Sequence, residues 1–187
     1  MRLFHKAEKP PAEAVARLDK DERVVSWAPA PGGAVVATPL GLWLPGVPDR
    51  LPWHLIDKAT WRSDVLTLIP AVDPGDGVLV EQPPKSVRLE QPRDIPQTVR
   101  VRVEKAIALT RHHPLPGTEG SGVRRGVRVV GRRVPGQDGV SWQLVFDAGV
   151  DRDDPAVRAA AAAYLNQARA ELGLLPSGAM GVTRRPR

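Results

Sequence analysis

The chain of 187 residues contains no cysteine, so disulfide bonds and thiolate metal sites are both excluded. The uncharged run AAAAAYLNQA in its carboxy-terminal third is too short and too polar to span a bilayer. The amino-terminal segment MRLFHKAEKPPAEAVARL lacks the apolar core of a signal peptide. These absences predict a cytoplasmic protein without integral membrane association.

Catalytic motifs are missing as well. No glycine is followed by lysine, which excludes the phosphate-binding loop of nucleotide-hydrolysing proteins, and there is neither a G-x-S-x-G nor an H-E-x-x-H motif. The segment GSGVRRG at 120–126 approaches a dinucleotide fingerprint, but its last spacing is wrong and no strand-to-helix setting surrounds it. We therefore expect no cofactor and no enzymatic activity, although a site assembled from scattered residues would leave no motif.

Two groups of potential metal ligands have a structural explanation. His112 and His113 could hold a metal, but neighbouring side chains point in different directions and no carboxylate lies at ligand spacing. We interpret the pair as the cap of a preceding helix's C-terminus. The acidic cluster consists of Asp147, Asp151, Asp153 and Asp154. Its spacing is not that of an EF-hand loop, and Asp-Asp-Pro is explained by helix capping, so no metal site is expected.

What the chain does contain is a series of short apolar runs over 23–70, cut by proline, glycine and aspartate. This segment holds four of the five tryptophans. Short runs rich in valine, leucine and tryptophan between turn residues are typical of an antiparallel meander around one core. Because large aromatic side chains favour burial, we assign these tryptophans to core packing in preference to ligand stacking.

The order of these runs resembles that of the bacterial pleckstrin-homology-like domains. The matching positions are Glu22, 35–38, 42–44, 51–56, Trp61 and 66–68. The resemblance covers about 18–112 and implies a small antiparallel β-barrel or sandwich capped by a helix. The whole chain is also similar to a family of actinobacterial proteins in which such a domain precedes an arginine-rich hairpin and an alanine-rich helix. That resemblance brings no known activity.

Beyond the meander, further strands are expected at 78–81 and 86–90. The segment 94–109 alternates like a strand in its middle, yet its apolar residues also share one helical face behind the N-cap candidate Asp94. We interpret it as a helix, partly because the resembled domain requires one there.

The last third predicts a hairpin over 126–134 and 140–147, with Trp142, Leu144 and Phe146 facing inward. Asp153-Asp154-Pro155 then opens a helix that ends at Gly173. Its apolar stripe, expected to lie on a sheet, consists of Val157, Ala161, Tyr164, Leu165, Ala168 and Leu172.

The predicted fold class is therefore α+β: a helix-capped, pleckstrin-homology-like small β-barrel or sandwich, followed by a hairpin and an alanine-rich helix. The predicted parts are an amino-terminal arm with a short helix (1–17), the barrel with its capping helix (18–116), a linker (117–122), the hairpin-plus-helix appendage (123–175) and a disordered basic tail (176–187).

One charged segment is a candidate binding site. It consists of Arg124, Arg125, Arg128, Arg132 and Arg133, with no acidic residue between Glu119 and Asp138. These guanidinium groups could bind phosphates or carboxylates, or they could simply keep an exposed hairpin soluble. The sequence favours a non-catalytic intracellular binding or scaffold module whose partner is an unknown protein. The alternative is binding of nucleic acid or another polyanion through the arginine-rich hairpin 124–133.

Overall fold

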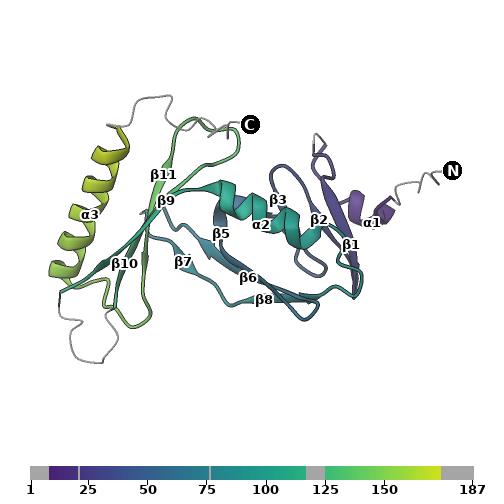
Figure 1. Cartoon of the computed structure of the whole chain (residues 1–187), viewed down its shortest axis with the longest axis horizontal. Helices are drawn as coiled ribbons and strands as arrows, with labels where there is room; N and C mark the ends of the chain where they lie inside the picture. The colour runs from purple at the N-terminus through teal and green to yellow at the C-terminus, as the bar shows by residue number, and fades with distance from the viewer. Residues whose placement is uncertain (1–8, 21, 76, 117–124, 174–187) are drawn as a thin grey trace, which may run out of the picture. The chain divides into compact units, whose positions relative to one another are not determined.

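Residues 9–20, 22–75, 77–116 and 125–173 are described by the computed structural model. They form an α+β structure with three antiparallel sheets and few helices (Figure 1). The chain divides into two compact units, the first made of Met1–Ala108 and Arg132–Ser141, the second of Leu109–Gly131 and Trp142–Arg187. Within the described residues, no helix has the length and apolar character needed to cross a membrane.

The first sheet of unit 1 has the strand order β1-β2-β3-β4. Its strands are β1 (Ser26–Ala30), β2 (Gly33–Ala37), β3 (Gly41–Trp43) and β4 (Leu51–Pro52). A tight turn joins β1 to β2, and Gly32 in it has a φ of 77°, which glycine adopts without steric cost. This strand order confirms the antiparallel meander that was predicted for the first part of 23–70. A short helix, α1 (Ala12–Val15), precedes the sheet.

The second sheet of unit 1 follows a 3-10 turn, η1 (Trp53–Leu55). Its strands are β5 (Ile56–Arg62), β6 (Val65–Val72), β7 (Val80–Glu81) and β8 (Lys85–Arg88). A two-residue turn, Ser63 and Asp64 with φ of 45° and 67°, connects β5 to β6, and β8 pairs with the other side of β6. Among the described residues β5 is therefore an edge strand of this sheet, and the sheets do not close into a barrel.

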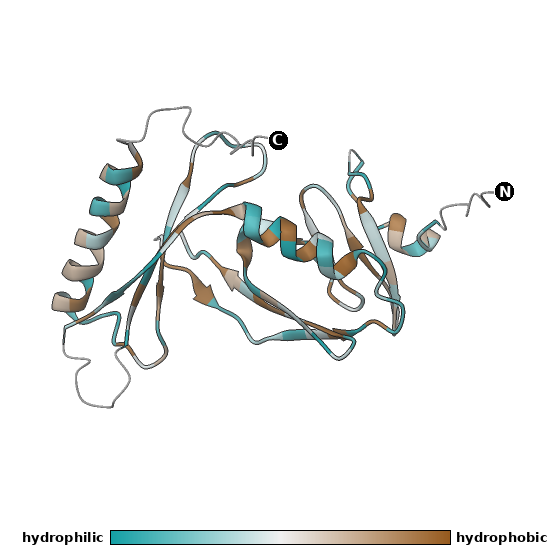
Figure 2. Cartoon of the chain, viewed as in Figure 1, coloured by the Kyte–Doolittle hydropathy of each residue, from teal (hydrophilic) through white to brown (hydrophobic). Residues whose placement is uncertain are grey.

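Both sheets and the helix α2 (Ile95–Ala106) share the core of unit 1. The core consists of Ala28, Val35, Ala37, Leu42, Leu44, Trp53, Ile56, Leu66, Leu68, Leu89, Ile95, Val99, Val103 and Ala106. Apolar and polar positions alternate along α2 (Figure 2) with the helical period, which turns Val99 and Val103 into the core. Trp43 and Trp53 are buried, as expected for core tryptophans.

The predicted helix over 94–109 is too long at its C-terminal end. It stops at Ala106, and Ile107–Pro114 forms the strand β9. The carbonyl of Ala106 accepts a hydrogen bond of 2.8 Å from the amide of Arg133, so long-range pairing replaces the next helical turn. His112 and His113 lie on this strand, and their interpretation as a helix cap is therefore wrong.

A buried carboxylate holds the segment before β1 to the first sheet. The side chain of Glu22 is fully buried. It accepts hydrogen bonds from Thr38 Oγ1 and from Trp43 Nε1, the latter at 3.2 Å, and its Oε1 lies 3.1 Å from Arg50 Nη1. Arg50 also pairs with Asp19 at 2.6 Å. A buried carboxylate is tolerated only when its charge is neutralised and its oxygens are hydrogen-bonded, and this network supplies both.

The third sheet has the order β11-β10-β9, with β10 (Gly126–Arg132) and β11 (Ser141–Phe146) as the predicted hairpin. The prediction that Trp142, Leu144 and Phe146 are the inward-facing residues of β11 is wrong in part. Trp142 and Phe146 are half-buried, whereas Gln143 and Val145 on the opposite face are buried with Leu144. Both faces of the strand are covered, so its burial does not alternate.

The carboxy-terminal helix α3 (Pro155–Gly173) lies in unit 2 and agrees closely with its prediction. Asp154 Oδ1 accepts hydrogen bonds from the amides of Ala156 and Val157, at 2.7 and 3.3 Å, and so caps the helix. Val157, Ala161 and Ala168 of the predicted stripe are buried. The predicted linker (117–122) and tail (176–187) fall outside the described residues.

Candidate functional site

The candidate site is a groove of unit 1 between the edge strand β5 and the N-terminal half of α2. We call it the β5–α2 groove; it has a volume of about 400 Å³. Its lining residues are Ala59, Thr60, Trp61, Leu66, Arg93, Pro96, Gln97, Val99 and Arg100. The volume lies in the range typical of small binding pockets, and the combination of an apolar lining with a few polar groups is typical of binding sites.

The floor of the groove is apolar because it is an extension of the core. Trp61 is half-buried and packs against the core cluster that contains Leu66 and Val99. An aromatic side chain that is only half-buried keeps part of its surface open to a ligand, and such surface contributes strongly to binding when it becomes covered. The prediction that the tryptophans pack in the core is therefore correct for Trp61 only in part.

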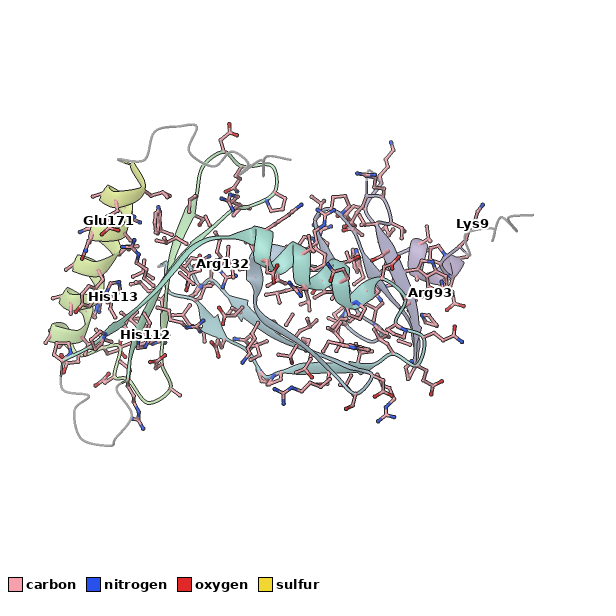
Figure 3. The ribbon with its side chains drawn as sticks, in the orientation of Figure 1. Lys9, Arg93, His112, His113, Arg132 and Glu171 are labelled. Atoms are coloured by element: carbon pink, nitrogen blue, oxygen red, sulfur yellow. The ribbon has the colours of Figure 1, made fainter. Side chains whose placement is uncertain are left out.

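Two arginines provide the positive charge of the groove. Arg93, labelled in Figure 3, precedes α2 with a φ of 49°, and its Cζ lies 3.8 Å from the centre of the Trp27 ring. A positive φ is costly for a residue with a side chain, and here the stacking on Trp27 fixes the guanidinium. Arg100 pairs with Glu104 one turn later, 3.0 Å away, but both side chains are exposed. Such a pair contributes little, so a ligand carboxylate can replace Glu104.

The described arginines of the segment 124–133 differ in their burial and in their partners. Arg124 lies outside the described residues. Arg125 is exposed and donates to the carbonyl of Gly149 at 3.3 Å, and Arg128 is half-buried. Arg133 donates to the carbonyls of Lys105 and Ile107 at 3.2 and 3.4 Å. These bonds give Arg125 and Arg133 a role in holding the backbone.

Arg132, which is labelled in Figure 3, is buried, since only 1% of its side chain is exposed. Its Nη2 lies 2.7 Å from Asp57 Oδ1, and its Nη1 donates to the carbonyl of Ile56 at 3.1 Å. Asp57 is 5% exposed, so this is a buried ion pair between β10 and β5 within unit 1. Burial lowers the pKa of the nearby His54 below its ordinary value of 6.5, and the charge of Arg132 lowers it further. Arg132 therefore presents no guanidinium to the surface.

The two neighbouring histidines each contact another residue of unit 2. His112 Nε2 lies 2.8 Å from Asp147 Oδ2, which also accepts the amide of Gly126 at 2.8 Å. Partial burial alone would raise the pKa of Asp147, but these hydrogen bonds outweigh it and hold the pKa below its ordinary value. His113, which is labelled in Figure 3, stacks on Tyr164 of α3, and the ring centres are 4.2 Å apart.

Nothing in the described part of the chain forms a metal centre: no three His, Asp or Glu side chains there converge as ligands would. Of the acidic cluster, Asp147 binds His112 and Asp154 caps α3. Asp151 Oδ1 accepts the amide of Asp153 at 3.0 Å, a local turn contact.

No family model, no curated protein and no solved structure matches this chain. The β5–α2 groove was not predicted from the sequence, because Trp61 and Arg100 come from elements separated by β6, β7 and β8. The signal available in the sequence was limited to two arginines, Arg93 shortly before α2 and Arg100 within it.

Proposed function

We propose that this chain is a non-catalytic, intracellular binding module of pleckstrin-homology-like fold that recognises a protein partner. The observation that carries the proposal is the β5–α2 groove, an apolar concavity bordered by Arg93 and Arg100. Both arginines are positively charged and border an apolar surface. The groove therefore favours a partner whose contact surface combines apolar side chains with carboxylates. The assignment to the pleckstrin-homology-like class is supported by two antiparallel sheets and one following helix around a common core.

Two binding modes are compared: a protein segment in the β5–α2 groove, and a polyanion on the arginine-rich hairpin. The first is favoured. Its two arginines lie beside apolar surface from the half-buried Trp61 and Pro96, so a ligand gains both charge neutralisation and hydrophobic burial. In the hairpin, by contrast, Arg132 and Arg133 are bonded to other parts of unit 1. The proposal therefore locates recognition in unit 1.

An affinity pull-down from the lysate of source cells tests the proposal, carried out with and without nuclease. The groove variant Gln97→Trp fills the concavity without changing its charge, and Arg100→Glu reverses one rim charge. Arg158→Glu is the matched control, because Arg158 is an exposed arginine of unit 2 outside the segment 124–133. We expect the wild type and the control to retain the same protein after nuclease treatment, and both groove variants to lose it.

Two results would contradict the proposal. If the groove variants capture the same protein as the wild type while remaining folded by circular dichroism, the groove is not the contact. If everything that binds is lost on nuclease treatment, the chain binds nucleic acid and the alternative through 124–133 replaces the proposal. A titration of the affinity against salt concentration then tests that alternative, because phosphate contacts weaken steeply as the salt concentration rises.

A further inference from the structure

The edge of β5 that borders the groove offers backbone hydrogen-bonding groups. In the β5–β6 hairpin Arg62 and Val65 flank a two-residue turn, so the carbonyl of Arg62 and the amide of Val65 point at each other. Backbone groups of an antiparallel strand alternate in direction from one residue to the next. Thr60, opposite Thr67, therefore bonds to β6, whereas the N–H and C=O groups of Ala59 and Trp61 point to the outer edge.

This edge is open to pairing within the described residues. The sheet order is β5-β6-β7 with β8 also on β6, and no described strand pairs with the outer side of β5. An unpaired edge is a template for another extended chain. The groove runs beside it, since Ala59, Thr60 and Trp61 form one of its walls and α2 forms the other.

The charges along the groove define the occupant. None of its lining residues is acidic, and two of them, Arg93 and Arg100, are cationic. Side chains of an added strand would alternate between the groove and solvent. One apolar side chain fits against the half-buried Trp61 and Pro96, and carboxylates on either side of it match the arginines.

We infer that an extended acidic segment of a partner protein adds to β5 as a further strand, pairing with Ala59 and Trp61 while its apolar side chain enters the β5–α2 groove. This inference rests on the proposed function and specifies its mode of recognition. Main-chain hydrogen bonds to the edge would supply affinity, and the groove would supply specificity.

The first step of the test selects a peptide ligand directly, so the identity of the partner is not needed. A library of random decapeptides is selected by display on the full-length chain, with the Gln97→Trp variant as the counter-selection. We expect enriched peptides to contain Asp or Glu on both sides of an apolar residue and to lack proline, which cannot complete a strand ladder. If no peptide is enriched over the variant, or if the enriched peptides are basic, the inference is overturned.

The second step tests strand addition at single residues. It measures amide hydrogen exchange rates by NMR in the presence of the best selected peptide. At a peptide concentration of about ten times Kd, exchange at Ala59 and Trp61 should slow by ~10-fold. Thr60 is the internal control, because its amide already bonds to β6 and should change little. The same peptide N-methylated at the positions that face β5 should lose binding.

The failure of this inference can be distinguished from failure of the proposed function. If the N-methylated peptide binds as well as the parent and Ala59 and Trp61 exchange as before, strand addition is refuted while the groove remains a binding site. If Ala59 and Trp61 are protected without peptide and sedimentation shows a dimer, the edge is occupied by a second copy of this chain and the inference is refuted as well.

Discussion

Removal of one partner of the buried ion pair between Arg132 and Asp57 should strongly destabilise unit 1. The two side chains are 1% and 5% exposed, so Asp57→Ala leaves the guanidinium charge of Arg132 buried without its carboxylate. Breaking a buried pair in this way costs about 3–5 kcal/mol. Since domains are stable by about 5–15 kcal/mol in total, this is a large fraction of the available stability.

Urea unfolding followed by tryptophan fluorescence measures this effect, because Trp27, Trp43, Trp53 and Trp61 all belong to unit 1. In thermal unfolding followed by the same fluorescence, the melting temperature of Asp57→Ala should fall by about 10 °C or more. The matched control is Glu104→Ala, which breaks the exposed pair with Arg100 and should cost about 0.5 kcal/mol or less.

A double variant separates the charge from the packing. Asp57→Leu combined with Arg132→Met removes both charges, and replacement of a buried pair by apolar groups is often neutral or stabilising. We therefore expect the double variant to recover most of the stability that Asp57→Ala loses. A loss below about 1 kcal/mol in Asp57→Ala would refute the reasoning, because it would mean that water reaches the guanidinium of Arg132.

Three further predictions concern caps, close packing and pH. Asp154→Ala should destabilise α3 by about 1 kcal/mol in thermal unfolding, whereas Asp153→Ala, which leaves the cap in place, should have a smaller effect; equal losses would count against the capping role. Gly126→Ala should cost about 1–3 kcal/mol, because a Cβ there would lie 2.2 Å from the carbonyl oxygen of His113; unchanged urea unfolding would contradict this packing. His54 has a lowered pKa in the folded state, so stability should be complete above its ordinary value of 6.5 and fall as the pH drops below it. His54→Gln should remove this part of the pH dependence, and an identical pH profile in both proteins would exclude the histidine as its source.

The local signals in the sequence were sufficient for the elements whose ends and faces depend on neighbouring residues. Asp154, Pro155 and the apolar stripe of α3 lie within one stretch of chain, and the structure places the cap and the buried face where they were expected. The turn at Gly32 and the strands around it were likewise predictable, because turn residues and side-chain alternation act over a few positions.

Features that depend on distant partners were not predictable in this way. Residues 107–114 fit either a helix end or a strand, and pairing in the third sheet decided for the strand. Arg132 has the sequence context of an exposed hairpin arginine, yet Asp57, 75 positions away, neutralises it in the interior. A buried charge requires a partner, and only the tertiary structure brings that partner within 2.7 Å.

The sequence by itself determined the α+β class, the run of antiparallel strands and the capped terminal helix, because backbone preference, turn chemistry and apolar periodicity are local properties. The tertiary structure decided which charges are buried and which border a groove. It placed Arg93 and Arg100 beside β5, although β6, β7 and β8 separate both arginines from β5 along the chain. A binding surface is a property of side chains that meet in space, and packing of α2 against β5 creates it.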